Sequence, residues 1–226
     1  FLSIPGSAYS YNVENAMPGI AFRSINGTYT PSAGVVNPQA EVLKIAGGEI
    51  DVDRALVKMH GPQQRAWTEM AKVKELARQI SYQLIEGDTA SNSIGFNGLK
   101  ARVPTTGTQA LDLGSAGAMS LKKLDQLIYM VDNPTHILMS KEQELNVRAY
   151  LRSGGSGAAA IQIEKDEFGR PLLTYAGLPI LIANRNGDVA TLAYGEASST
   201  ASLFVLSVGM DTYHGLQNGG IEVKDL

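Results

Sequence analysis

The acidic residues that could do chemistry are concentrated between residues 46 and 62, in the stretch AGGEIDVDRALVKMHGP. Apolar and acidic residues alternate from Glu49 onward, which predicts a strand over 49–59 in which alternate residues share a face. Asp51 and Asp53 would then point to the same side, where two carboxylates could hold a hard cation. Because no third acidic or histidine ligand stands at a suitable spacing, the pattern favours a charged strand face with Arg54 as an ion-pair partner.

The other motifs that could support catalysis or cofactor binding are incomplete. The three histidines, His60, His136 and His214, stand alone, and none forms a paired metal-binding spacing such as HExxH. Residues 154–157 (GGSG) resemble part of a nucleophile elbow, but Ala158 stands where GxSxG requires glycine. Neither a P-loop nor GxGxxG occurs. The sequence therefore predicts no catalytic, metal-binding or cofactor-binding residues.

Composition narrows the classes of protein further. The chain has 226 residues, a formal net charge of −3 and no cysteine, so it offers no disulfide, no thiolate site and no basic field for nucleic acid. No apolar run approaches the roughly 18 residues that a membrane span requires, and we expect no membrane contact. Because the chain begins with Phe1 rather than Met, we expect an N-terminal segment to precede it in the whole protein.

The first 60 residues are expected to be extended and to lack a core of their own. Asn26-Gly27 lies between β-type residues and predicts a hairpin turn. Pro18, Pro31 and Pro38 make a central strand unfavourable. The apolar residues of this arm cannot offset its ordering entropy unless another chain buries them. Among them are Phe22, Ile25, Tyr29 and Val35.

Residues 62–86 form the clearest predicted element, a long helix that we call the spine. Pro62 suits the first helical position, and Gly87 suits the residue that follows the helix. About 25 residues at about 1.5 Å each make a rod of nearly 40 Å. The apolar residues recur at steps of three and four and form one continuous stripe. The stripe consists of Ala66, Met70, Val73, Ala77, Ile80 and Leu84.

The second half of the chain alternates helices and strands. Ser120 and Ser140 are expected to cap two helices on either side of the buried strand THILMS. Three strands within AIQIEK, LLTYAG and LPILIAN follow in a hairpin-like run, and ATLAYG, SLFVLSV and GIEVKD are expected to be strands as well. This order predicts an α+β fold rather than a doubly wound parallel sheet.

Several stretches carry a resemblance to a known family through their order and spacing. They are ENAMPGIAFRSINGTYTPSAGVVNPQAEVLKIAGGEIDVDRALVKM, QQRAWTEMAKVKELARQISYQLIEGD, GFNGLKAR, LDQLIYMV, PTHILMSKEQELNVRAYL and FGRPLLTYAGLPILIANRN. The last contains Gly177-Leu178-Pro179-Ile180, which matches a G-x-P-[IVL] pattern. Together they resemble the major capsid proteins of tailed bacteriophages over almost the whole chain. The resemblance implies an extended β-hairpin loop, a long spine helix in a peripheral domain, and a mixed α/β axial domain.

The resemblance also implies a division of the chain into four parts. Residues 1–60 would be an N-terminal arm remnant and the extended loop, with a strand leading into the peripheral domain. Residues 61–94 would hold the spine helix of the peripheral domain, and 95–195 the axial domain. Residues 196–226 would return to the peripheral domain as strands.

The function implied by the resemblance is structural rather than enzymatic. The chain would assemble with copies of itself into hexamers and pentamers of an icosahedral-type shell around the phage genome. Portal, scaffolding and decoration proteins would be further partners, and packaged double-stranded DNA would be touched only non-specifically. The expected location is the virion, after assembly in the host cytoplasm.

Intersubunit contacts are expected at the extended loop and at its base. The residues expected to make them are Phe22, Arg23, Tyr29, Lys44, Glu49, Asp51, Asp53 and Arg54. Some relatives join a loop lysine covalently to a neighbouring asparagine; Lys44 is the candidate here, and we expect no such crosslink. Three alternatives stay open: an encapsulin-like nanocompartment shell, a tail or adhesion protein, and a metal-dependent hydrolase that uses Asp51 and Asp53.

Overall fold

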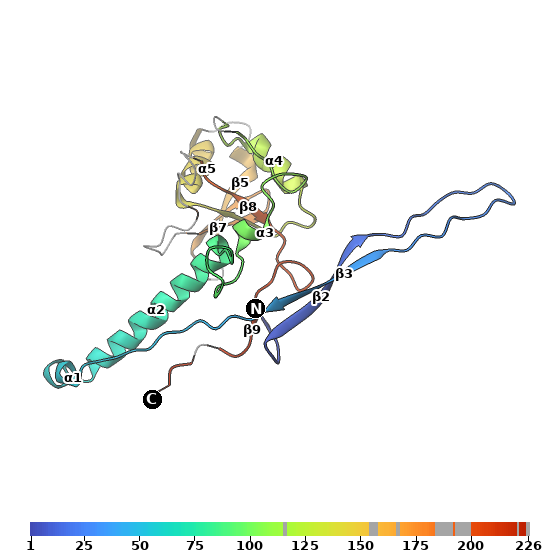
Figure 1. Cartoon of the computed structure of the whole chain (residues 1–226). Helices are drawn as coiled ribbons and strands as arrows, with labels where there is room; N and C mark the ends of the chain where they lie inside the picture. Colours follow the sequence, from blue (N-terminus) through green and yellow to red (C-terminus); the bar gives the residue numbers. More distant parts are fainter. Residues whose placement is uncertain are drawn as a thin grey trace. The chain divides into compact units, whose positions relative to one another are not determined.

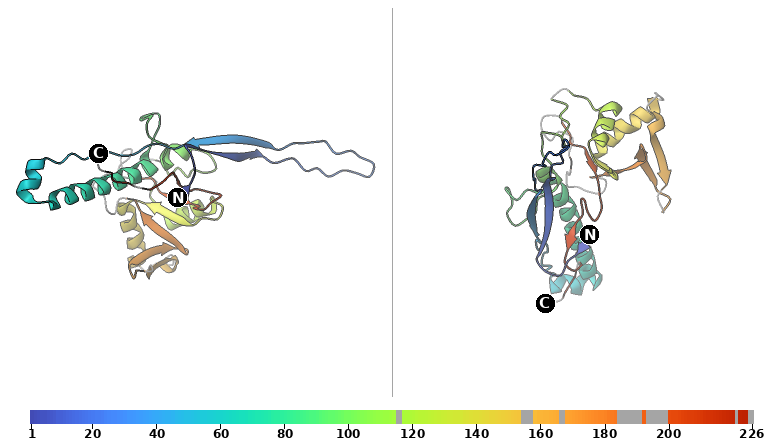
Figure 2. Two further views of the ribbon diagram at one scale, coloured as in Figure 1. Left: turned by 90° about the horizontal axis from the view of Figure 1, so that it is seen from below. Right: turned by 90° about the vertical axis from the view of Figure 1, so that its right-hand side faces the viewer.

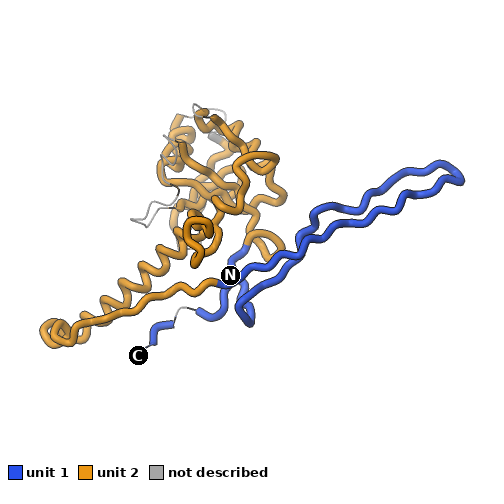
Figure 3. The backbone as a smooth tube through the Cα atoms, in the orientation of Figure 1, with its two compact units in different colours: residues 1–43, 214–226 blue, residues 44–213 orange. Residues whose placement is uncertain are grey.

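The computed structural model describes residues 1–114, 117–153, 158–165, 168–183, 192, 200–220 and 222–224. The chain forms two compact units (Figures 1 and 3). The first consists of Phe1–Leu43 and His214–Leu226, and the second of Lys44–Tyr213. Mixed helices and strands confirm the predicted α+β class.

A long two-stranded ribbon dominates the first unit. Strand β2 (Ala8–Ala16) pairs antiparallel with β3 (Val35–Val42), with a register shift near the distal end of the pair. Residues 17–34 continue beyond the ribbon as two neighbouring legs without strand pairing (Figures 1 and 2). A second pair, β1 (Leu2–Ser3) with β9 (Leu216–Gln217), is parallel. The predicted hairpin is therefore confirmed, with its strands set back from the turn.

The turn at the tip of the loop lies where Asn26-Gly27 predicts it. The backbone N–H of Gly27 donates to the Ser24 carbonyl at 3.0 Å. Asn26 has a φ of 66°, in the left-handed region that asparagine tolerates better than most residues. Local turn chemistry thus defines the end of the loop.

The segment after the ribbon corrects one expectation, because 49–59 is not a strand. Residues 44–53 have no regular secondary structure, and α1 (Arg54–His60) follows. The carboxylate of Asp53 accepts a hydrogen bond from the Ala55 N–H at 2.8 Å and caps the helix. The helix-forming residues after this cap therefore determine the local structure, and the short alternation of apolar and acidic residues before it does not produce a strand.

The spine helix is confirmed as α2 (Gln63–Glu86). Pro62 occupies the N-cap rather than the first helical position, and Gly87 has a φ of −58° rather than a left-handed conformation. Gly87 is needed for close packing, because an added Cβ would lie 2.4 Å from the carbonyl oxygens of Gln83 and Phe96. The Gly98 N–H donates to the Gly87 carbonyl at 2.8 Å, which joins the end of the spine to α3 (Leu99–Arg102).

A five-stranded sheet in the order β5-β6-β7-β4-β8 forms the centre of the second unit. The β4–β7 pair is parallel, and the other pairs are antiparallel. The strands are β4 (His136–Met139), β5 (Ile161–Lys165), β6 (Pro171–Tyr175), β7 (Leu178–Ile182) and β8 (Phe204–Leu206). The helices beside them are α4 (Leu121–Tyr129), α5 (Lys141–Ser153) and the short η1 (Ala158–Ala160).

The core of this unit lies between the sheet and the two longer helices. Leu124 of α4 and Val147 of α5 contribute to one cluster with buried residues of four strands. Its further members are Ile137, Met139, Ile161, Leu173, Tyr175 and Ile180. The Tyr175 hydroxyl donates to an Asp125 carboxylate oxygen at 2.7 Å, and burial together with this carboxylate raises the pKa of Tyr175.

The two predicted helix caps are confirmed. The Ser120 hydroxyl accepts from the Lys123 N–H, and the Ser140 hydroxyl accepts from the Gln143 N–H at 3.2 Å. The prediction for the tail is right only in part. SLFVLSV contains β8, but residues 222–224 of GIEVKD have no regular structure. Except for Leu192, the predicted strand ATLAYG lies outside the described residues, as does GGSG (154–157).

Candidate functional site

The loop of residues 17–34 carries the most exposed large apolar side chains of its unit. The Phe22 side chain is fully exposed, and Ile20 and Ile25 are 95% and 92% exposed. Burying one such side chain contributes about 1.5–3 kcal/mol, and contiguous exposed apolar patches commonly mark interaction sites. We call Ile20, Phe22 and Ile25 the loop-tip surface.

Arg23 and Tyr29 brace the loop tip from within. The Arg23 guanidinium lies 5.2 Å from the centre of the Tyr29 ring, and one of its nitrogens donates to the Gly27 carbonyl at 3.3 Å. These contacts join the two legs across the turn. The structure therefore brings together two of the predicted interface residues, and it leaves Phe22 beside them without cover.

The acidic group at 49–54 does not share a strand face. Glu49 and Asp51 lie in the irregular segment, while the Asp53 carboxylate caps α1 and Arg54 begins that helix. Among the described residues, no three or more His, Asp or Glu side chains are grouped so that they could hold a metal ion. A carboxylate that accepts a helix N–H has less capacity left for a cation, so this geometry does not favour the hydrolase alternative.

The irregular segment runs along the spine helix (Figures 1 and 2). The Lys44 ammonium donates to the Ser93 carbonyl at 3.1 Å, which ties the start of the segment to the loop after α2. At Gly48 an added Cβ would lie 2.7 Å from Cε of Lys72, so the backbone passes close to the spine side chain. Lys44, expected at an intersubunit contact, thus makes an internal contact in this chain.

A second exposed apolar surface lies at the start of the spine and was not predicted. Trp67 is 66% and Met70 is 71% exposed on α2, and Leu56 and Met59 of α1 are exposed as well. We call these four residues the spine-start surface. In the apolar stripe of the helix, Met70 is exposed and Val73, Ile80 and Leu84 are half-buried. Full burial occurs at Ile85, next to the stripe near the end of the helix. The sequence signal for this surface was the length of the apolar stripe, because a stripe along a 24-residue helix is longer than the core of one chain can cover.

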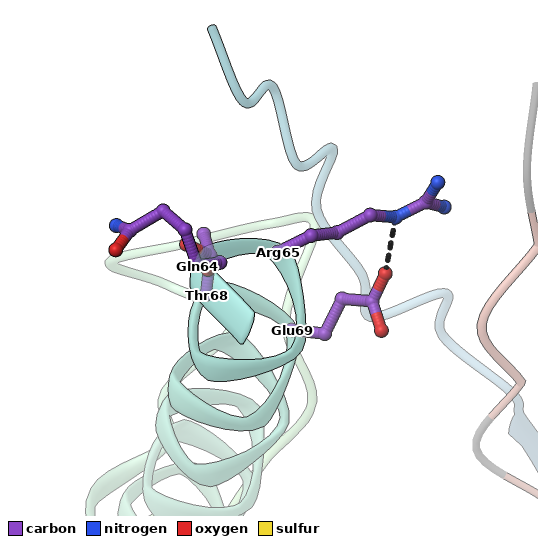
Figure 4. A network of polar contacts seen from close by, with 4 residues as sticks. All are labelled: Gln64, Arg65, Thr68 and Glu69. Atoms are coloured by element: carbon purple, nitrogen blue, oxygen red, sulfur yellow. Dashed lines mark hydrogen bonds and ion pairs between the residues drawn. The ribbon is translucent and has the colours of Figure 1, made fainter. Parts of the chain in front are cut away.

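Polar contacts occupy another part of the same first turns of the spine. Arg65 Nε donates to Glu69 Oε1 at 2.8 Å, an i,i+4 ion pair (Figure 4). The Thr68 hydroxyl donates to the Gln64 carbonyl at 2.9 Å. Such exposed pairs contribute only about 0.3–0.5 kcal/mol each. The spine therefore begins with a solvated side and an apolar side.

Comparisons with solved structures identify the fold. The capsid of an empty GTA (gene transfer agent) particle is similar at 16% identity and a TM-score of 0.53, over 85% of this chain and 67% of that chain. The capsid of the native GTA particle is similar at 16% identity and a TM-score of 0.54, over 85% and 68%. No protein-family model and no curated protein sequence matches the chain. The similarity confirms the predicted phage-type capsid fold.

No helix in the described part of the chain is both long enough and apolar enough to cross a bilayer.

Proposed function

We propose that this chain is the structural subunit of a virus-type capsid and assembles with copies of itself into a closed shell around a genome. The observation that carries the proposal is the loop-tip surface, an uncovered apolar surface in a chain with a capsid fold. An extended loop of this kind gains little by folding alone and gains stability when a neighbouring chain buries its apolar residues.

Two separate apolar surfaces on one chain favour a repeating assembly over a single dimer. The loop-tip surface belongs to one compact unit and the spine-start surface to the other. When different surfaces of a chain meet surfaces of its neighbours, the contacts are heterologous and generate rings where the rotation between neighbours closes. Each contact can be modest because a shell repeats it many times. Hexamers and pentamers are the rings that we propose.

The parts of the subunit follow from this proposal. The loop within 1–60 would lie over a neighbouring subunit, and residues 61–94 would form the backbone of the peripheral domain. Residues 95–195 would form the axial domain at the centre of each ring, with 196–226 returning to the peripheral domain. The sheet and its core supply the rigid body that such a ring requires.

Charged residues near the base of the loop would add specificity to the contact between subunits. Glu49, Asp51 and Arg54 are exposed in the single chain. Exposed ion pairs contribute about 0.2–1 kcal/mol each, so they would select a geometry rather than drive association. Asp53 contributes less because its carboxylate is engaged by the Ala55 N–H.

Further partners and the location follow from the same role. A portal, a scaffolding protein and decoration proteins would complete a shell that is assembled in the host cytoplasm and released as a virion. The net charge of −3 favours only weak, non-specific contact with packaged double-stranded DNA.

Electron microscopy and sedimentation of the concentrated protein test the proposal. We expect closed particles or hexameric and pentameric rings, and we expect Phe22→Ala to reduce their yield strongly. Phe168→Ala is the matched control, since Phe168 is also an exposed phenylalanine but lies outside the loop. A whole protein that stays monomeric at every concentration, or assembly that Phe22→Ala leaves unchanged, would contradict the proposal.

The contents of the particles distinguish the two shell alternatives. Nuclease-protected DNA is expected for a virus-type capsid, and enclosed enzymes are expected for an encapsulin-like compartment. Open tubes or fibres would favour a tail or adhesion protein.

A further inference from the structure

Asn-Gly steps are chemically fragile, and the described residues contain three of them. They are Asn26-Gly27, Asn97-Gly98 and Asn218-Gly219. In such a step the glycine carries no side chain to obstruct attack of its own amide nitrogen on the asparagine side chain. Packing and hydrogen bonding at each site decide whether that attack can occur, because they set how easily the backbone opens.

Asn26 stands at the exposed tip of the loop and is weakly held. Its side chain is exposed, and no group in the described part of the chain hydrogen-bonds it. The Gly27 N–H makes one hydrogen bond, to the Ser24 carbonyl at 3.0 Å. The legs on either side of the turn have no strand pairing, and they are joined by side chains: Arg23 donates to the Gly27 carbonyl and lies at the Tyr29 ring, and the Ser32 hydroxyl donates to the Gly19 carbonyl.

Asn97 lies in the opposite environment. Its side-chain oxygen accepts from the Thr89 N–H at 2.8 Å, and the Gly98 N–H donates to the Gly87 carbonyl at 2.8 Å. Gly98 is also tightly enclosed, because an added Cβ would lie 2.6 Å from the Gln83 carbonyl oxygen. Reaction there would require the junction after the spine helix to open.

Asn218 is held less firmly than Asn97 and more firmly than Asn26. Its side-chain amide nitrogen donates to the Gly6 carbonyl at 3.0 Å, which holds the group that would have to leave. Gly219 shows no neighbouring atom within contact distance of an added Cβ, so packing around the glycine is open.

From this contrast we propose that Asn26 is a site of spontaneous deamidation in the unassembled subunit. The Gly27 amide nitrogen attacks Cγ of Asn26, forming an N–Cγ bond while the Cγ–Nδ2 bond breaks. The amide proton of Gly27 leaves with the amide group as ammonia, and a succinimide remains. Water then opens either C–N bond of the succinimide and yields aspartate or isoaspartate. Nothing is oxidised or reduced.

The product changes the loop tip in two ways. A carboxylate appears within three residues of Arg23, whose guanidinium lies at the Tyr29 ring and donates to the Gly27 carbonyl. Isoaspartate also inserts a methylene into the backbone of the turn, which displaces the residues on either side. The charge and the backbone length of the loop tip therefore change with time.

The rate of deamidation is measured on the dilute, full-length chain, incubated in mildly alkaline buffer and digested with trypsin. Mass spectrometry of the fragment from Ser24 to Lys44 reports the amide-to-acid mass change. The fragments with Asn97 and Asn218 serve as internal references and are sequenced by fragmentation, because they also contain Asn92 and Asn186. We expect Asn26 to react at least about tenfold faster than Asn97, because two hydrogen bonds must break at the latter. Equal rates at the two sites would overturn the inference.

Two variants test whether the mass change of the fragment comes from the succinimide reaction at Asn26. Gly27→Ala is expected to slow the reaction at Asn26 at least about tenfold without unfolding the chain, since Gly27 has no left-handed φ. An added Cβ would lie 3.2 Å from the Ser24 carbonyl oxygen, a close contact that a small shift of the turn relieves. Asn26→Gln is expected to abolish it. An unchanged rate in Gly27→Ala would also overturn the inference. These rates are measured before assembly, so they do not depend on the proposed shell.

Discussion

The loop of residues 17–34 and the five-stranded sheet use apolar residues in opposite ways. In the sheet, Ile137 and Met139 are fully buried against helices of the same chain. In the loop, Phe22 and Ile25 are exposed, and the contacts that order it include the turn, the Arg23–Tyr29 brace and the hydrogen bond from the Ser32 hydroxyl to the Gly19 carbonyl. The chain's own fold therefore buries the apolar residues of the sheet and leaves those of the loop exposed.

Truncation of apolar side chains in the two regions gives the largest expected contrast. Ile137→Ala removes buried methyl groups from the core and should lower the free energy of unfolding by about 2–5 kcal/mol. Phe22→Ala should change it by less than about 0.5 kcal/mol, because the side chain contacts little in the free chain. Urea denaturation of the unassembled protein measures both. A large loss of stability in Phe22→Ala would break the comparison.

Glycine substitutions at the end of the spine should have the next largest effect. Gly87→Ala places a Cβ 2.4 Å from two carbonyl oxygens and should destabilise the second unit by about 1–3 kcal/mol. Gly47→Ala is the control, because an added Cβ there meets nothing within 4 Å and no left-handed φ is needed. Thermal unfolding distinguishes them, and equal midpoints would contradict the close packing at Gly87.

The two aspartates before α1 should differ by a smaller amount. Asp53→Ala removes a helix cap and should cost about 0.5–2 kcal/mol of stability. Asp51→Ala should be close to neutral, because Asp51 lies exposed in the irregular segment. Circular dichroism during urea titration measures the difference. If both variants behaved alike and added Mg²⁺ or Ca²⁺ stabilised only the parent, the acidic-site interpretation would regain support.

Limited proteolysis should cleave the loop and the helices around the sheet at different rates, and it requires no substitution in the chain. Trypsin should cut the free chain first after Arg23, since exposed loop tips are preferred sites of cleavage. Arg148, whose guanidinium pairs with Glu144 at 2.7 Å within α5, should resist for much longer. On the proposed function, assembly should protect Arg23. Cleavage at Arg23 that is equally fast in assembled particles would place the loop tip outside the contact.

Several elements were predictable from the sequence because their causes are local. The turn at Asn26-Gly27 and the caps at Ser120 and Ser140 depend on residues within a few positions of one another. The long spine follows from an apolar stripe with helical spacing. Such signals act over one turn or one helix and do not require knowledge of the partner.

The prediction of a strand over 49–59 was wrong because it rested on a local pattern alone. Four residues of alternating character, Ile50 to Asp53, fit a strand face, but a strand also needs a partner to satisfy its backbone. No described strand pairs with this segment, and Asp53 instead caps α1. The same cap explains why the predicted pair of carboxylates does not form a common face.

The sequence by itself determined the spine helix, the two serine-capped helices, the turn of the loop, the α+β order and the family that the chain resembles, because these depend on local patterns and their succession. Only the tertiary structure decided that Trp67 and Met70 stay exposed while Ile85 is buried, since a stripe does not reveal how far its own core extends. It also decided that Gly87 serves close packing, because approach between distant backbone atoms is a property of the folded chain.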